Sequence, residues 1–314
     1  MIVTLTPNPS VDRTIEVDEL VRGAVLRARN SRVDPGGKGV NVSRALAAHG
    51  IKTRAVLPSG GAEGAQLAAL LEPRGIEIVP VPISGAVRAN VSVVEPDGTV
   101  TKLNEPGPEL DAGEVELLVA ATRGAAEAGR WVVCCGSLPR GVPADFYATL
   151  LPVLHEAGCR VVVDSSGPAL TAALPHRPDL IKPNREELAE AAGQPVNTVG
   201  DAVAAARSLM RRGAATVLAS LGADGALLID GDEAYHAEAH VATPRSAVGA
   251  GDATLAGFLA GGGHGPGALV TAIAWGAAAT SLPGSRMPTP QDLDPDSVHL
   301  HAGVAADRVL KGSA

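Results

Sequence analysis

Apolar residues follow two patterns along most of the chain, short continuous runs and longer stretches with a helical period. The two kinds of segment alternate, which predicts a parallel sheet with helices on both faces. The predicted strands are 2–5, 53–57, 131–135, 160–164, 179–181 and 216–220. The predicted helices are about 39–49, 62–72, 111–128, 143–157, 185–192 and 199–212.

Four short segments break this alternation, and three of them alternate apolar with polar residues. They are too short for strand–helix units, so they predict a small separate sheet. They are 13–17, 27–33, 88–94 and 99–103. The last two flank Glu-Pro-Asp-Gly at 95–98, a hairpin turn sequence. Residues 253–281, rich in Ala and Gly, predict two helices joined by the loop 261–267.

Composition narrows the class of protein. Of 314 residues, 46% are hydrophobic but only 2% aromatic, so we expect a core of Ala, Val and Leu. A net charge of −8 argues against a nucleic-acid partner. No long apolar run predicts a membrane span, and the N-terminus resembles a strand rather than a signal peptide, so we expect a cytoplasmic protein. The three cysteines form no disulfide or metal-binding pattern.

The most informative segment is 247–258, in which Gly249 and Gly251 precede Asp252 and a helical pattern follows. A glycine-rich turn that opens a helix directs free backbone N–H groups, here those of Ala250, Gly251 and Asp252, at one point that suits a phosphate. An aspartate repels a bare anion, but it can take a proton from a hydroxyl that attacks a phosphate. We therefore predict that Asp252 is the base of an alcohol kinase. The helix N-terminus should favour the charged form of this carboxylate. The alternative is an ordinary glycine-rich loop.

A second glycine-rich segment, 35–44, precedes another helical pattern. Gly36, Gly37 and Gly39 allow close approach of a ligand, and Lys38 and Asn41 can hydrogen-bond to it. The segment is not a Walker A loop, because Gly rather than Ser or Thr follows the lysine.

These two segments resemble the signatures of the ribokinase-like (PfkB) family of sugar kinases. Five more segments, in the same order, resemble its phosphofructokinase/tagatose-6-phosphate kinase branch, and within it the 1-phosphofructokinases. They are 6–12, 104–108, 136–143, 182–188 and 220–225. The resemblance covers nearly the whole chain. Ala247 and Ala253 stand where the family usually has Thr and Ser, which leaves the base and its glycines intact.

The resemblance implies a ribokinase-like α/β fold, a three-layer sandwich with a mainly parallel central sheet and a small β-sheet lid. It implies an α/β domain that binds nucleotide and sugar, and a lid that covers the sugar and joins two subunits into a homodimer. The α/β domain would comprise 1–12, 34–87 and 104–314, and the lid 13–33 and 88–103.

The resemblance also implies ATP-dependent phosphorylation of fructose 1-phosphate to fructose 1,6-bisphosphate, with Mg²⁺. The phosphorylated ketohexose would contact residues from the lid and the glycine-rich loop, namely Asp12, Arg27, Gly36, Gly37, Lys38, Asn41, Arg88, Asn104 and Ser137. ATP would contact Lys182, Asn184, Ser220, Gly222 and Gly225 together with Gly249 and Gly251. Glu187 would hold Mg²⁺ through water. From the residues alone, Asn184 and Glu187 also fit a helix cap, and 220–225 also fits a hairpin turn.

Rival functions remain open. A tagatose-6-phosphate kinase or a 6-phosphofructokinase would keep the chemistry and change the sugar. A non-catalytic sugar-phosphate sensor is disfavoured by the intact Asp252 segment. A nucleotide-dependent oxidoreductase is disfavoured because no Gly-x-Gly-x-x-Gly follows the first strand.

Overall fold

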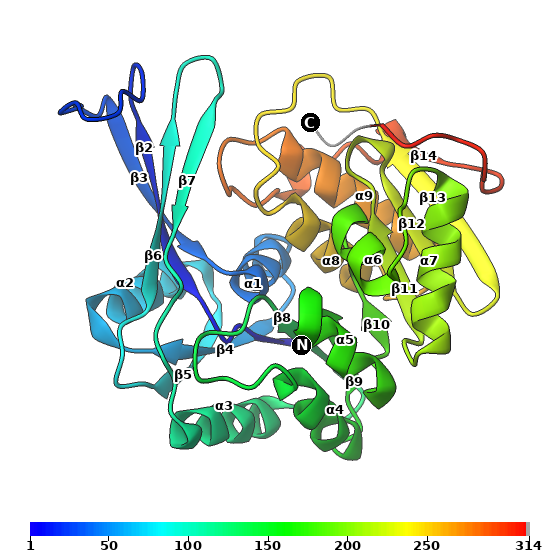
Figure 1. Cartoon of the computed structure of the whole chain (residues 1–314), viewed down its shortest axis with the longest axis horizontal. Helices are drawn as coiled ribbons and strands as arrows, with labels where there is room; N and C mark the ends of the chain where they lie inside the picture. Colours follow the sequence, from blue (N-terminus) through cyan, green and yellow to red (C-terminus); the bar gives the residue numbers. More distant parts are fainter. Residues whose placement is uncertain (312–314) are drawn as a thin grey trace.

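The computed structural model describes residues 1–311, which form two β-sheets and the helices that cover the larger one (Figure 1). The helices are α1 (Lys38–Ala48), α2 (Gly61–Leu71), α3 (Ala112–Ala125), α4 (Phe146–Glu156), α5 (Gly167–Ala173), α6 (Arg185–Ala192), α7 (Val199–Arg211), α8 (Ala250–Ala260) and α9 (Gly265–Thr280). The strands of the large sheet are β1 (Ile2–Leu5), β4 (Thr53–Ser59), β5 (Glu77–Pro82), β8 (Trp131–Cys135), β9 (Arg160–Asp164), β10 (Leu180–Ile181), β11 (Thr216–Ser220), β12 (Ala226–Asp230), β13 (Glu233–Ala239) and β14 (Val298–Leu300). The small sheet contains β2 (Ser10–Glu16), β3 (Asn30–Gly36), β6 (Arg88–Val94) and β7 (Val100–Asn104).

The large sheet has the strand order β14-β13-β12-β11-β10-β9-β8-β1-β4-β5. From β11 to β5 all neighbouring strands are parallel, and β12, β13 and β14 extend one edge in antiparallel fashion. The predicted mainly parallel sheet is therefore confirmed. The carboxyl ends of the parallel strands bring their following loops to one edge, where ligands bind in such sheets.

Both faces of the large sheet are covered, which gives three layers. Successive strand residues alternate between two cores: Val132 and Cys134 of β8 face one, and Val133 and Cys135 face the other. Residues of α3, α4, α5 and α7 contribute to the first core, and residues of α1, α8 and α9 to the second. Burial on both faces explains the continuous apolar runs of these strands.

The small sheet, called the lid below, stands beside the body of the molecule (Figure 1). Its order is β3-β2-β6-β7, with β6 and β7 forming the predicted hairpin. Two predicted strand boundaries are wrong. The first strand begins at Ser10 because Val11 is buried and continues the alternation, and the second begins at Asn30 rather than at residue 27.

Several elements were missed by the apolar patterns. Strand β5 contains Pro80 and Pro82, which the edge of a sheet tolerates. Strands β12 to β14 and the short helix α5 were also not predicted. Helix α4 begins at Phe146, after a turn at 143–145. Within residues 1–311, the helices lack the length and apolar character needed to cross a membrane.

Candidate active site

Helix α8 begins at the segment that the sequence singled out. Its N-cap is Gly249, whose φ of 79° lies in the left-handed region that favours glycine. Ala250, Gly251 and Asp252 form the first turn. The Ala250 N–H donates to the carbonyl oxygen of Ala247 over 3.3 Å, contrary to the expectation of a free group, whereas the N–H groups of Gly251 and Asp252 have no partner within the helix. The ammonium group of Lys182 lies next to Gly251, because a Cβ on that glycine would be 3.3 Å from Nζ. This helix end therefore combines free amides with a lysine, which suits a phosphoryl group.

Asp252 is buried, with an exposed fraction of 7%. Burial raises the pKa of its carboxyl to about 6, and the nearby negative charge of Asp164 adds to this effect. Lys182, a hydrogen bond from Asn41, and Lys38 act in the opposite direction. Burial thus outweighs the expected influence of the helix N-terminus, and the raised pKa suits a group that accepts a proton near neutral pH.

Helix α1 fixes the orientation of Asp252. The Asn41 side chain donates from Nδ2 to Oδ2 of Asp252 over 2.8 Å. Arg44, one turn further along α1, donates from Nη1 to Oδ1 of Asn41 over 2.9 Å and to the carbonyl oxygen of Pro35 over 3.0 Å. These contacts fix which end of the Asn41 amide faces Asp252. The other carboxylate oxygen of Asp252 has no protein partner in this chain of contacts.

Two lysines meet at Asp164, the last residue of β9. Lys38 Nζ lies 2.8 Å from Asp164 Oδ1, and Lys182 Nζ lies 3.3 Å from Oδ2. Asp164 is fully buried; although burial alone would raise its pKa, Lys182 and Lys38 hold it below the ordinary value. The structure thus brings together residues predicted for the sugar side and the nucleotide side around one buried carboxylate.

Asn184 and Glu187 form a capping box at the start of α6. Asn184 Oδ1 accepts from the Glu187 backbone N–H over 2.8 Å, and Glu187 Oε2 accepts from the Asn184 N–H over 2.9 Å. The capping interpretation left open by the sequence describes this local geometry. The other Glu187 oxygen lies 3.5 Å from Lys38 Nζ, so this carboxylate also faces the lysine pair.

The carboxylates of this site can supply Mg²⁺ with only one or two protein ligands. Among residues 1–311, no group of three or more His, Cys, Asp or Glu side chains converges in a metal-binding arrangement. Asp164 Oδ2, however, is a buried acceptor that has the ion pair with Lys182 but no well-directed hydrogen bond. Mg²⁺ usually takes one or two carboxylates and fills its octahedron with water and phosphate oxygens. Glu187 and Asp164 suit that role.

Asp12 is positioned at the root of the lid. Its Oδ1 accepts from Ser10 Oγ over 2.7 Å and from Asn90 Nδ2 over 2.9 Å. Gly36 faces it across the β2–β3 ladder, and a Cβ there would overlap the Asp12 carboxylate. Gly37, the N-cap of α1, has φ 108°. Glycine is therefore required at both positions by close packing and by backbone geometry.

Arg88 lies near Ser137 and is linked to it through Asn8. Arg88 donates from Nη2 to the carbonyl oxygen of Asn8 over 3.1 Å and from Nη1 to that of Glu105 over 3.0 Å. The Asn8 side chain donates to Ser137 Oγ over 3.4 Å. Arg88 Nε is buried without a hydrogen-bond partner. A guanidinium with an unpaired donor, linked to a hydroxyl through Asn8, suits a ligand anion.

Two other predicted sugar-binding residues are exposed in the lid and its loop. Arg27 lies in the exposed loop between β2 and β3, not in a strand as expected, because β3 begins only at Asn30. Asn104 is the exposed last residue of β7, in register with Asn90. Asn90 joins Asn104 to Asp12 across the lid. Within one chain, Arg27 has no such connection among the described contacts.

The segment 220–225 is the turn between β11 and β12, as the hairpin interpretation has it. Ser220 pairs with Asn184 in an isolated bridge, which brings the turn next to the start of α6. Gly222 and Gly225 have positive φ, and a Cβ on Gly225 would overlap the carbonyl oxygen of Ala237. The predicted nucleotide residues of α6 and of this turn are therefore neighbours.

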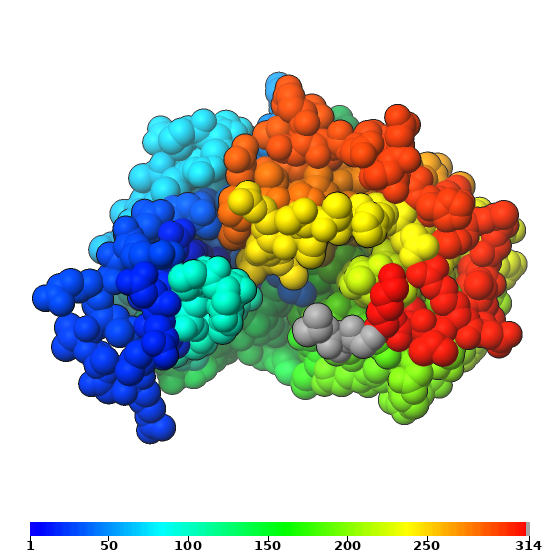
Figure 2. Space-filling view, turned by 90° about the horizontal axis from the view of Figure 1, so that it is seen from above, coloured from blue at the N-terminus to red at the C-terminus, as the bar shows by residue number. Residues whose placement is uncertain are grey.

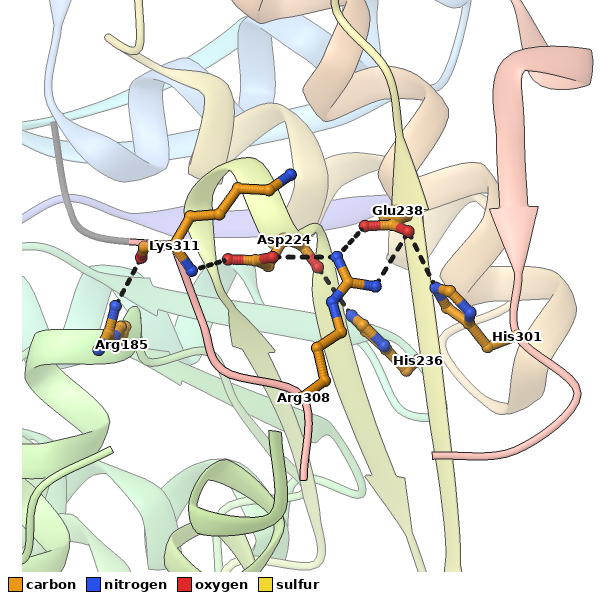
Figure 3. A network of polar contacts seen from close by, with 7 residues as sticks. All are labelled: Arg185, Asp224, His236, Glu238, His301, Arg308 and Lys311. Carbon is orange, nitrogen blue, oxygen red and sulfur yellow. Dashed lines mark hydrogen bonds and ion pairs between the residues drawn. The ribbon is translucent and has the colours of Figure 1, made fainter. Parts of the chain in front are cut away.

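The C-terminal segment fastens this turn to the body (Figure 3). Asp224, 1% exposed, accepts from Arg308 Nη2 over 3.0 Å and from the Lys311 N–H over 2.7 Å. Arg308 also binds Glu238, and that interaction lowers the pKa of Glu238 to about 2. Arg185, the first residue of α6, donates to the Lys311 carbonyl oxygen over 2.8 Å. One short segment thus joins both loops predicted to contact ATP.

Three polar residues of the site were missed by sequence reasoning: Asp164, Asn8 and Asn90. Asp164 carried a usable signal, because it ends a predicted parallel strand and so reaches the ligand edge of the sheet. Asn8 lies within a quoted motif, but its role depends on contacts with residues 106 and 137 that are distant in sequence.

The sequence matches one family of carbohydrate kinases over most of its length. Residues 5–290 match the description "pfkB family carbohydrate kinase". A 1-phosphofructokinase of Rhodobacter capsulatus is 40% identical over 82% of this chain and 82% of its own. An ATP-dependent 6-phosphofructokinase isozyme 2 of Mycobacterium tuberculosis is 36% identical over 83% of this chain and 77% of its own.

Solved structures of phosphofructokinase-2 superpose on this chain over most of its length. Phosphofructokinase-2 from Escherichia coli, described in complex with potassium, superposes with a TM-score of 0.87 and is 32% identical, covering 93% of this chain and 96% of its own. A tetrameric inhibited form of that protein superposes with a TM-score of 0.82 at 32% identity, covering 89% and 92%.

Proposed function

Because the chain belongs to the pfkB family of carbohydrate kinases, we propose that it transfers the γ-phosphoryl group of ATP to fructose 1-phosphate. The products are fructose 1,6-bisphosphate and ADP. The observation that carries the proposal is the arrangement around Asp252: a buried carboxylate with a raised pKa at a helix end that offers free amides and Lys182.

The residues divide the work of the reaction. Asp252 accepts the proton of the sugar's free primary hydroxyl as that oxygen forms a bond to the γ-phosphorus, and the bond from phosphorus to the bridging oxygen of ADP breaks. The free amides of Gly251 and Asp252 stabilise the charge on the transferring group. Asn41 holds Asp252 in place. Lys182 neutralises charge on the phosphates.

The remaining groups position the two substrates. Mg²⁺, bound with the nucleotide near Glu187 and Asp164, would neutralise phosphate charge. The segment 220–225 and Asn184 line the nucleotide side. Asp12 accepts hydrogen bonds from sugar hydroxyls, and Arg88 with Ser137 binds the phosphate that the sugar already carries, because a planar guanidinium fits a phosphate with two parallel hydrogen bonds.

Substrate choice is the part of the proposal that needs a direct test. Relatives named 1-phosphofructokinase favour fructose 1-phosphate, whereas the relative named 6-phosphofructokinase keeps fructose 6-phosphate as a second candidate. ADP release should be measured side by side with fructose 1-phosphate, fructose 6-phosphate and tagatose 6-phosphate. We expect the highest kcat/KM with fructose 1-phosphate. A higher value with either other sugar would reject the proposed substrate, and no ADP release with any of them would reject the kinase assignment.

A further inference from the structure

A second group of basic side chains surrounds a pocket of about 530 Å³ away from the reacting groups. The pocket lies between the root of the lid and the segment after α9, which is orange in Figure 1. Arg32 and Asp34 come from β3, Arg44 from α1, Arg74 from the turn after α2, and Arg286 from the segment after α9. Four arginines and one aspartate thus line one cavity.

The arginines around this cavity are only partly paired with carboxylates. Arg32 Nε donates to Asp34 Oδ2 over 2.7 Å. The other three arginines do not share this ion pair. Within residues 1–311, Arg44, Arg74 and Arg286 have no carboxylate partner within 4.0 Å. Burial lowers the pKa of Arg44 to about 10, and the positive charge of Arg74 adds to this effect, whereas Asp34, Asp12 and Asp252 oppose it. Crowded positive charge is unfavourable unless an anion offsets it.

The size and chemistry of the pocket point to one class of ligand. A volume of this order accommodates a small metabolite. Arginine is the side chain best suited to phosphate, since its fork forms two parallel hydrogen bonds. We propose that this pocket binds a small metabolite with two or more phosphate groups, at a site separate from the active site. This site goes beyond the proposed function and does not depend on which sugar is phosphorylated.

The pocket is joined to the active site by direct contacts. Arg44 lines the pocket and donates to Asn41 over 2.9 Å, and Asn41 donates to Asp252 over 2.8 Å. The methyl group of Met287, also in the pocket wall, lies against Gly249 at the start of α8. A ligand that draws on Arg44 changes the support of the catalytic carboxylate, so filling the pocket should change kcat.

Inorganic pyrophosphate is a suitable probe for binding. Titration calorimetry of the whole wild-type chain should require two independent classes of site, the active-site anion hole and this pocket. The double variant Arg74→Ala/Arg286→Ala should keep the first class and weaken the second about 100-fold, at about tenfold per guanidinium lost. Both side chains are exposed and lie outside the active site, so the variant should fold and retain its basal kcat.

The matched control is Arg123→Ala/Arg130→Ala, which removes the same charge from an exposed surface outside both sites. It should keep both classes of site. A wild type with a single class, or a double variant Arg74→Ala/Arg286→Ala that keeps both, overturns the proposal. Fructose 1,6-bisphosphate and ADP should then compete with pyrophosphate for the second class. Displacement by one of them identifies a sugar bisphosphate or a nucleotide as the source, and displacement by neither overturns the assignment to a phosphorylated metabolite.

The link to Asp252 has its own readout. At saturating ATP, sugar phosphate and Mg²⁺, pyrophosphate should change the kcat of the wild type by at least about twofold. The same additions should leave the kcat of Arg74→Ala/Arg286→Ala unchanged, which also controls for competition at the active site. An equal response of the two proteins overturns the link.

Discussion

At the level of single residues, the proposed chemistry depends on one buried carboxylate, Asp252, whose surroundings were only partly predictable from the sequence. The glycine-rich segment before Asp252 predicted its place at a helix start. The raised pKa of Asp252 could not be predicted, because it follows from burial and from the charge of Asp164. Asp164 is distant in sequence, and only the fold brings it near. Asn41 was predicted as a sugar ligand, but its hydrogen bond to Asp252 depends on the packing of α1 against α8.

Replacing Asp252 tests the assignment of the base. Asp252→Asn keeps the shape of the side chain and removes its ability to accept a proton. We expect turnover to fall by at least about 100-fold, the typical effect of losing a general base. Nucleotide binding, measured by calorimetry, should survive. A variant that retains more than about a tenth of wild-type turnover, with chemistry rate-limiting, would contradict the assignment.

The pH dependence of the reaction gives an independent test. Asp252 must be deprotonated to act as a base, and its pKa is raised to about 6, so kcat/KM should fall as pH drops through about 6. Asn41→Ala removes a hydrogen bond that favours the charged form, so its acid limb should lie at higher pH. Protonation of the substrate phosphates is the same for both proteins and cancels in this comparison. Coincident acid limbs would show that Asp252 is not the titrating group.

Replacing Arg88 tests the proposed division of the site into a sugar side and a nucleotide side. Losing a charge-assisted hydrogen bond to phosphate costs about 2–3 kcal/mol. Arg88→Ala should therefore raise the KM for fructose 1-phosphate about 30- to 150-fold and change the KM for ATP little. A sugar without the phosphate should be an equally poor substrate for both proteins. A variant that binds ATP weakly and the sugar phosphate normally would contradict this division of the site.

At the level of secondary structure, the predictions were most accurate for strands whose apolar side chains are buried on both faces of the sheet. Strands β1, β8, β9 and β11 were predicted with the observed bounds, because strands buried on both faces give uninterrupted apolar runs. Strand β5 and the antiparallel strands β12 to β14 were missed. Their sequences contain prolines or mixed polarity, and their pairing depends on neighbours placed by the rest of the fold.

The C-terminal segment illustrates an element whose role no local pattern reveals. Arg308 lies far in sequence from Asp224, yet it neutralises this buried carboxylate within the predicted nucleotide turn. Arg308→Ala leaves a buried charge poorly compensated, and we expect the free energy of unfolding to fall by about 2–3 kcal/mol in urea denaturation. Arg207→Ala, which loses one exposed hydrogen bond to a carbonyl oxygen, is the control and should cost less than about 1 kcal/mol. Equal costs for the two variants would contradict the proposed role of Arg308.

At the level of the whole molecule, the lid is the part that leaves the most apolar surface exposed in a single chain. Figure 2 shows its blue loop protruding beyond the body. Among residues 1–311, most exposed large hydrophobic side chains belong to the lid and its loop: Leu20, Val21, Val25, Leu26, Val100 and Leu103. A small sheet with open edges and exposed apolar residues is marginally stable in water, and pairing with a second copy would cover both.

We therefore predict that the protein is a homodimer through its lid. Light scattering at micromolar concentration should give twice the mass of the chain. Leu103, 62% exposed on β7, would be buried in such a dimer, so Leu103→Glu should give monomers. It should also reduce activity, because the lid, which we propose covers the sugar, loses its support. Leu117→Glu places the same charge on a residue of α3 that is 53% exposed and lies off the lid, and this control should remain dimeric and active. A wild type that is monomeric and fully active at micromolar concentration would reject the prediction. A dimer that Leu103→Glu leaves intact would show that the subunits associate through another surface.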